Sequence, residues 1–300
     1  MTTAEAAADR PLRGILLITA SIALFSVSDA LAKLLTGSLP PVEVGWLRYV
    51  TFFALTLTPF LFRRNAFSRA LRPKAPGLQL LRGLGMLGSA IAFIFALRVM
   101  PIAEATAINF VSPAFITALS IPVLGEVVGW RRWTAVAVGL VGVLIVIRPG
   151  TGAFGVEALL PIATAATWAC AAVITRRLAS AGDGPEVTLF WSAGVGLVVL
   201  TAALPFDFVV PTAGQVGLGV LVGVISSVGH SLVVLAYRAA PASVIAPFSY
   251  LQLLFSTLMG IILFGAAPDR WTALGAVIIT ASGLYTAHRE RVRARERLSR

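Results

Sequence analysis

Two pairs of hydrogen-bonding side chains occupy matching positions in this 300-residue sequence. Asn109 and Ser112 are three residues apart, and Ser249 and Gln252 repeat that spacing in the second half of the chain. In a helix this spacing puts both members of a pair on one face. Such amide and hydroxyl groups either bind the polar end of a small molecule or hydrogen-bond to a neighbouring helix without any ligand.

Aromatic side chains accompany the polar pairs. Phe110 and Tyr250 each directly follow the first member of a pair, and Trp168 in the second half corresponds to Phe25 in the first. Rings of this kind can stack on an aromatic substrate while the amide and hydroxyl groups bind its polar end. His230 is a further candidate, because its imidazole either lines a binding cavity or donates to a neighbouring carbonyl.

The composition requires a membrane. Hydrophobic residues make up 58% of the chain and charged residues 12%, and the mean hydropathy is +0.90. The stretches 187–206, 208–237 and 239–268 contain no Asp, Glu, Lys or Arg. A bilayer crossing takes roughly 20 apolar residues, so these stretches favour membrane helices over one soluble core. The sequence contains no nucleophile–base pair, metal-ligand cluster or phosphate loop, which predicts a protein without enzymatic activity or cofactor.

Charged and helix-breaking residues inside apolar stretches are candidates for gating or coupling. Asp29 is the one carboxylate well inside an expected helix, and a charge at the bilayer centre costs about 2.5–3.5 kcal/mol. Lys33 follows four residues later on the same helix face, so the two residues either form a structural ion pair or Asp29 couples transport to protons. Pro113 and Pro247 each remove a backbone donor, which either frees carbonyl groups for a substrate ammonium or simply kinks the helix.

Ten apolar segments are expected to form an all-α membrane bundle around a central cavity. Their ranges are 13–35, 43–62, 78–98, 102–124, 130–148, 156–177, 186–206, 213–236, 243–265 and 270–288. With alternate loops assigned to opposite sides, the 24 Lys and Arg residues divide 19 to 5. Because cytoplasmic loops carry the excess of positive charge, both chain ends are predicted to be cytoplasmic. The N-terminal tail at 1–12 and the basic tail at 289–300 then serve as topology anchors, without a nucleic-acid partner.

The sequence repeats itself. The Arg-x-x-Pro pattern at Arg98 returns at Arg238, and the Arg-Trp-Thr-Ala sequence at Arg132 returns at Arg270. The two copies are predicted to span 13–148 and 156–288. Because each copy contains five expected helices, the second copy enters the membrane from the opposite face. Inverted repeats of this kind are typical of transporters whose site lies near the midplane, between the halves.

Several short segments carry a family resemblance. They are Pro113-Ala114-Phe115, Gly125-Glu126, Trp133 and Gly139. With the order and lengths of the expected helices, they resemble the ten-helix EamA-type branch of the drug/metabolite transporter superfamily. In that family a Gly-Glu pair often closes the fourth helix of each copy. Gly125-Glu126 fits this pattern in the first copy, but the second copy has Gly265-Ala266 instead. Any role of Glu126 therefore belongs to one side of the membrane only. The resemblance is strongest to bacterial exporters of amino acids, particularly aromatic ones.

These observations predict an inner-membrane transporter that moves neutral amino acids or similar metabolites outward by alternating access. A phosphorylated substrate would be met by Arg or Lys, and only Lys33 and Arg48 are plausible for that role, so small molecules without net charge fit better. Two alternatives stay open. A proton-coupled exporter of cationic drugs needs a titratable carboxylate such as Asp29, and a non-transporting scaffold or sensor would use small-residue faces such as Gly219-x-x-x-Gly223 for packing. The expected partners are the lipid bilayer and a small-molecule substrate, and the number of chains stays open.

Overall fold

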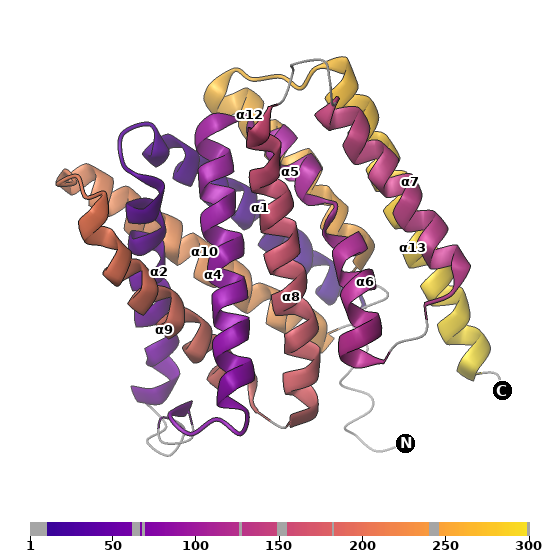
Figure 1. Ribbon diagram of the computed structural model, residues 1–300, viewed down its shortest axis with the longest axis horizontal. Helices are drawn as coiled ribbons and strands as arrows, with labels where there is room; N and C mark the ends of the chain where they lie inside the picture. The colour runs from indigo at the N-terminus through magenta and orange to yellow at the C-terminus, as the bar shows by residue number, and fades with distance from the viewer. Residues whose placement is uncertain are drawn as a thin grey trace.

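The computed structural model describes residues 11–61, 67, 70–125, 128–148, 155–181, 183–239 and 246–298. Within these ranges every regular element is helical and none is a strand (Figure 1). The elements are α1 (Pro11–Thr36), α2 (Pro41–Leu61), α4 (Pro76–Val99), α5 (Ile102–Asn109), α6 (Ser112–Leu124), α7 (Trp130–Ile147), η1 (Val156–Ala158), α8 (Leu159–Ala181), α9 (Pro185–Ala203), η2 (Leu204–Phe206), α10 (Ala213–Ala239), η3 (Ala246–Tyr250), α12 (Leu251–Phe264) and α13 (Arg270–Leu298).

The helices are long and apolar enough for a bilayer. Among the described residues, six helical spans of 21 to 25 residues satisfy the length and hydropathy of a membrane crossing. Large apolar side chains such as Val198, Leu254 and Val277 are more than half exposed along the outer surface. A soluble protein would not expose so many, so lipid is the solvent of this surface. The protein is therefore a helical membrane protein.

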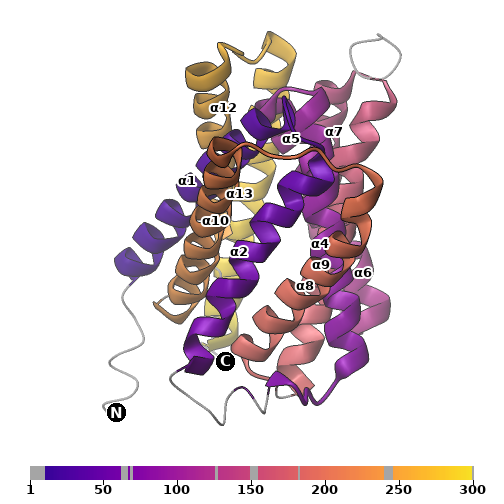
Figure 2. The same cartoon turned by 90° about the vertical axis from the view of Figure 1, so that its left-hand side faces the viewer.

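The connections between helices gather at two ends of the bundle (Figures 1 and 2). One end, called the Asp269 end, contains the connections 37–40, 204–212 and 265–269, and Gln215 donates there to Ser38 Oγ at 2.9 Å. The opposite end, called the Asp183 end, contains the connections around 70–75 and 183–184, where Trp191 Nε1 donates to the carbonyl of Ala70 at 2.8 Å.

Helices from the first and second halves of the sequence interleave. The most extensive pairings are α1 with α10, α4 with α8, and α7 with α13, and α2 lies between α9 and α10 (Figure 2). The face of Gly219 and Gly223 packs on α2, where added Cβ atoms would lie 2.5 Å from Leu47 Cδ1 and 2.5 Å from Thr51 Cβ. Small residues therefore allow two backbones to approach closely, as expected in lipid, where hydrophobic drive between helices is weak.

Two of the expected helices are interrupted. The segment 102–124 divides into α5 and α6 around Phe110 and Val111, and the described part of 243–265 begins with the 3₁₀ turn η3 before α12. Pro113 lacks the N–H that a continuous helix would direct to the carbonyl of Asn109, which accounts for the first break. Pro247 lies inside η3. The breaks lie where Pro113 and Pro247 were expected to remove backbone donors, although the sequence did not place the ends of the separate helices.

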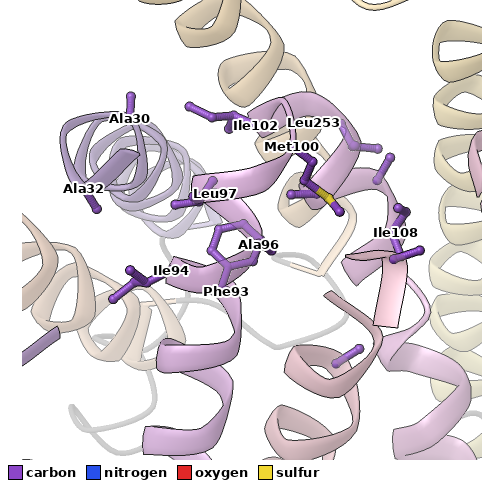
Figure 3. Packing of buried hydrophobic residues seen from close by; sticks show 14 of the residues in the cluster. Ala30, Ala32, Phe93, Ile94, Ala96, Leu97, Met100, Ile102, Ile108 and Leu253 are labelled. Carbon is purple, nitrogen blue, oxygen red and sulfur yellow. The ribbon is translucent and has the colours of Figure 1, made fainter. Parts of the chain in front are cut away.

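A buried apolar cluster holds α1, α4, α5 and α12 together near the Asp269 end (Figure 3). Leu97, Ile102 and Ile108 are almost completely buried there, and Leu253 joins them from the second half. Tight packing of these side chains gives the break between α5 and α6 a fixed position.

Most other helix ends lie within a few residues of the expectation. The exception is α13, which continues to Leu298 rather than ending at 288. Every second residue of the added segment is Arg, and Glu290, Ala294, Glu296 and Leu298 lie among them, all of which are strong helix formers. Glu126 and the first ten residues lie outside the described part of the chain.

Candidate functional site

Hydroxyl groups join α1 to α10 in the interior. Ser21 Oγ donates to the carbonyl of Gly229 at 2.8 Å, and Ser28 Oγ lies 2.7 Å from Ser226 Oγ and 3.2 Å from the carbonyl of Val222. All three serines are buried. Polar groups in a membrane need such internal partners, because lipid offers none.

His230 of α10 lies beside this interface. Its Nδ1 is 2.9 Å from the carbonyl of Ser226, and because a carbonyl accepts only, Nδ1 carries the hydrogen of this bond. The ring packs edge-on against Phe25 at 4.8 Å between centroids and lies tilted against Phe52 at 5.6 Å. The sequence left open whether His230 bonds a carbonyl or lines a site; the carbonyl bond is present.

The buried carboxylate Asp29 pairs with α2. Its Oδ1 lies 3.9 Å from Arg48 Nη1, and the residue is 8% exposed. Lys33 does not pair with it. Instead, Lys33 Nζ donates to the carbonyl of Leu97 and, at 2.8 Å, to that of Met100 at the end of α4. A lysine satisfies the last carbonyls of a helix well, so the predicted Asp29–Lys33 pair was wrong in its partners.

Arg82 of α4 is a buried charge that reading the sequence missed. Its Nε donates to Thr175 Oγ1 at 2.7 Å, and its Nη1 donates to the Ser192 hydroxyl and, at 3.3 Å, to the carbonyl of Thr188. The residue is 9% exposed. Its charge is one of the 19 that the sequence assigned to the cytoplasmic side. No local signal identifies its partners, because 93 and 110 residues separate Arg82 from Thr175 and Ser192.

The half-buried Arg48 of α2 and the buried Arg82 of α4 lie within electrostatic range of the same two groups. Arg48 and Arg82 each interact electrostatically with the Tyr49 phenol and the His230 imidazole. We call Asp29, Arg48, Tyr49, Arg82 and His230 the central polar cluster. With two guanidinium groups and one carboxylate, this cluster carries an excess of positive charge.

The predicted polar pairs lie at the helix breaks. Phe110 stacks on Tyr250 with ring centroids 5.2 Å apart and planes 22° from parallel, so the two corresponding positions do meet. Asn109 Oδ1 is buried and accepts no hydrogen bond from any described residue. Ser112 is half-buried at the start of α6, Gln252 is half-buried in α12, and the side chain of Ser249 is exposed.

Other predicted site residues lie apart from this stack. His230 belongs to the central polar cluster. Trp168 of α8 is 40% exposed, and no described ring packs against it, whereas its sequence counterpart Phe25 contacts His230. Pro113 is exposed in the first turn of α6. The polar candidates therefore form two groups rather than one.

At each end of the bundle an aspartate from the second half contacts residues of the first half. At one end Asp269 Oδ2 lies 2.7 Å from Arg148 Nη1, which we call the Asp269 latch. Asp269 Oδ1 also accepts the N–H of Thr272 at 2.8 Å. This N–H lowers the pKa of Asp269 against the opposing effect of burial, and Arg148 lowers it further.

At the other end Asp183 accepts two hydrogen bonds from the first half. The donors are the backbone N–H of Lys74, at 2.9 Å from Oδ1, and Gln79 Nε2, at 2.9 Å from Oδ2. We call this arrangement the Asp183 latch. Both latches tie elements that lie far apart in sequence.

The chain is similar to known transporters over nearly its whole length. The model of the EamA-like transporter family matches the chain twice, at residues 12–148 and 156–286. A riboflavin transporter of Rhizobium johnstonii is 33% identical over 287 residues, covering 93% of this chain and 92% of the relative. An S-adenosylmethionine uptake transporter of Rickettsia prowazekii is 28% identical, covering 93% and 94%. A pseudopaline exporter of Pseudomonas aeruginosa is also 28% identical, covering 90% and 94%.

A solved crystal structure has the same fold. It matches with a TM-score of 0.64 and 25% identity, over 92% of this chain and 98% of the other. The expected family is therefore confirmed, whereas the functions that these relatives are named for are not specifically amino-acid export. On the two family matches and the one-third identity to a relative of similar length, this chain is a member of the EamA-like transporter family.

Proposed function

We propose that this protein carries a planar, uncharged metabolite of the riboflavin class across the bacterial inner membrane. The observation that carries the proposal is the central polar cluster, in which Arg48 lies 3.9 Å from Asp29, whereas Arg82 forms no ion pair with any described carboxylate. Riboflavin has a flat ring system with carbonyl oxygens that accept hydrogen bonds. Guanidinium groups supply the donors, and the rings of Phe52 and His230 supply surfaces for stacking.

The relatives support the same substrate class. Riboflavin transporters occur among them twice, at 33% identity in Rhizobium johnstonii and 29% in Vibrio cholerae. Other relatives are named for S-adenosylmethionine and pseudopaline.

The proposed architecture is ten membrane spans in two inverted repeats that alternate in access. The helix packing supports it. By their order in the two repeats, α1 corresponds to α8, α4 to α10 and α7 to α13. Exchanging each helix for its counterpart turns the pair α1–α10 into α8–α4 and leaves the pair α7–α13 unchanged, so the main pairings are preserved. The two family matches point the same way. The positive charge then assigns the Asp183 end to the cytoplasm together with both chain ends.

A second candidate substrate is a neutral aromatic amino acid, as the sequence predicts. The observation in its favour is the stack of Phe110 on Tyr250 beside the unpartnered Oδ1 of Asn109. This oxygen can accept a hydrogen bond from a substrate ammonium while the rings hold the side chain. Outward movement stays a prediction, since the names of the relatives include both uptake and export.

Export of cationic drugs is the class that the cluster disfavours. Such a carrier needs a carboxylate that alternates between proton and drug, but Asp29 is already engaged by Arg48. If Asp29 served that role, Asp29→Asn would abolish drug flux and leave the movement of neutral substrates down their gradient intact. We expect no cation flux in the unaltered protein.

Flux measurements in proteoliposomes test the proposal. Labelled compounds are supplied either inside or outside the proteoliposomes, and liposomes without protein are the control. The compounds are riboflavin, phenylalanine, tryptophan, threonine, methionine and a lipophilic cation. Riboflavin flux supports the proposal. Flux of amino acids alone contradicts the riboflavin assignment and supports the second candidate. Flux of the cation alone supports a drug exporter. No flux of any compound supports a scaffold or sensor.

A further inference from the structure

The strongest unassigned feature of the interior is the free edge of Arg82. A guanidinium has five N–H bonds. Nε and Nη1 donate to Thr175, Ser192 and Thr188, but Nη2 donates to no residue in the described ranges. No described carboxylate forms an ion pair with Arg82 either. A buried arginine with two undirected N–H bonds is costly unless a ligand accepts them.

Gln79 supplies the complementary atom one helical turn away. It lies three residues before Arg82, on the same face of α4, and is fully buried. Its Nε2 donates to Asp183 Oδ2 and, at 3.3 Å, to Thr188 Oγ1. Because a carboxylate accepts only, this orientation of the amide is fixed, and Gln79 Oε1 is the atom left buried without a donor.

Both residues are anchored to Thr188 of α9. Gln79 donates to its hydroxyl and Arg82 to its carbonyl, so the second half holds the two side chains together. One face of α4 therefore offers an unused donor, Arg82 Nη2, and an unused acceptor, Gln79 Oε1. A planar group with a carbonyl oxygen next to an N–H satisfies both atoms.

We propose that Gln79 and Arg82 form a subsite for an amide or imide edge of the substrate, with Arg82 binding the carbonyl oxygen and Gln79 accepting the neighbouring N–H. The Asp183 latch covers Gln79, so the second contact forms when that end opens. This inference rests on the proposed function and deepens it, because the pyrimidine ring of riboflavin carries such an edge whereas an α-amino acid does not. It assigns specificity to the ring rather than to the sugar alcohol.

Binding to the full-length protein in nanodiscs tests the subsite through quenching of flavin fluorescence. The probes are riboflavin and its N3-methyl derivative, which lacks the N–H. We expect Arg82→Gln to weaken both probes on the order of 10- to 100-fold, since a charge-assisted hydrogen bond is lost. Gln79→Met is expected to weaken riboflavin about fivefold to tenfold and the methyl derivative hardly at all. Arg98→Gln, at the exposed far end of α4, is the matched control and should bind normally.

Folding is controlled by Arg82→Lys, which keeps the positive charge and can still reach Ser192 but lacks the guanidinium fork. Its thermal stability should approach that of the unaltered protein while riboflavin binding stays weakened. The subsite is overturned if the unaltered protein binds riboflavin and its N3-methyl derivative equally. It is also overturned if Arg82→Gln and Arg82→Lys bind riboflavin as tightly as the unaltered protein.

A separate ligand pair distinguishes this failure from failure of the riboflavin assignment. If neither flavin binds, phthalimide and N-methylphthalimide are compared by thermal shift at millimolar concentration. Stabilisation by phthalimide that disappears in Arg82→Gln supports the subsite with another imide as its substrate. Absence of any Arg82-dependent shift overturns the subsite as well.

Discussion

Phe110 and Tyr250 come from opposite halves of the chain, yet their rings stack with centroids 5.2 Å apart where two helices are interrupted. The Tyr250 ring also lies against Gly283 of α13, where an added Cβ would overlap Cζ and the hydroxyl of the tyrosine. The stack thus joins both halves of the sequence and depends on a missing side chain in a third helix.

Gly283→Ala is expected to displace the Tyr250 ring and to destabilise the protein by about 1–3 kcal/mol through overpacking. In a Tyr250→Ala background the same substitution should cost much less, because its clashing partner is gone. Thermal unfolding of the four proteins gives the coupling. Gly217→Ala, on an exposed face with no atom within 4 Å, is the control and should be neutral or slightly stabilising. Additive effects at positions 250 and 283 would contradict the proposed contact.

Asn109→Ala should leave stability nearly unchanged and reduce amino-acid flux. Removing a buried acceptor that has no donor loses no hydrogen bond within the protein. Gln79→Ala provides the contrast, since the Gln79 amide has two partners and its loss should cost about 1–3 kcal/mol. Both are followed by thermal unfolding, and Asn109→Ala also by phenylalanine flux. A large loss of stability in Asn109→Ala would show that the residue holds helices together.

Asp269→Asn isolates the Arg148 ion pair, because asparagine can still cap α13 through the N–H of Thr272. The pair is partly exposed, so the loss of stability should stay below about 1 kcal/mol. We expect the Asp269 end to open more often. A single-cysteine reporter at that end, in a Cys170→Ser background, should react faster with a maleimide. Asp207→Asn, an exposed aspartate, serves as the control.

The same latch predicts a pH dependence. The pKa of Asp269 is lowered by the Thr272 N–H against burial and by Arg148, so this carboxylate stabilises the folded protein fully above its ordinary value of 3.8. The contribution is lost as the pH falls below 3.8 through the lower folded value. The thiolate fraction of the reporter falls equally with pH in both proteins, so the ratio of the maleimide labelling rate of Asp269→Asn to that of the unaltered protein should be constant from neutral pH to about 5 and stay above one. A change centred near neutral pH would require another titrating group.

Asp183→Ala is expected to open the opposite end. The substitution removes the acceptor of the Lys74 N–H and one acceptor of Gln79, both joined to Asp183 at 2.9 Å. Because the buried Gln79 amide loses a partner, the free energy of unfolding should fall by about 1–3 kcal/mol. A reporter cysteine near residue 75 should react faster with a maleimide. Asp207→Ala is the matched control. Unchanged labelling at residue 75 would mean that the latch does not limit opening of this end.

The positions of the helices could be predicted because lipid imposes one simple requirement on long apolar segments. The proline at position 113 and the matching polar pairs also located the region where the helices break and where Phe110 meets Tyr250. Those features depend on residues that are close in sequence, so they can be predicted without knowing how the helices pack.

The partners of buried charges could not be predicted in the same way. Arg82 depends on Thr175 and Ser192 in two other helices, and Asp29 meets Arg48 rather than the lysine one turn away. Spacing along one helix favoured Lys33, but the carbonyl ends of α4 offered that lysine better hydrogen bonds. Such choices are decided by helix packing, which local spacing does not encode.

The serines between α1 and α10 have a mechanical consequence. A hydroxyl that bonds a backbone carbonyl, as Ser21 does with Gly229, can exchange it for the next carbonyl along the helix at little cost. An ion pair at the same place would hold one register rigidly. The contact between α1 and α10 therefore allows the two helices to shift past each other, because each hydroxyl can keep an acceptor during the movement.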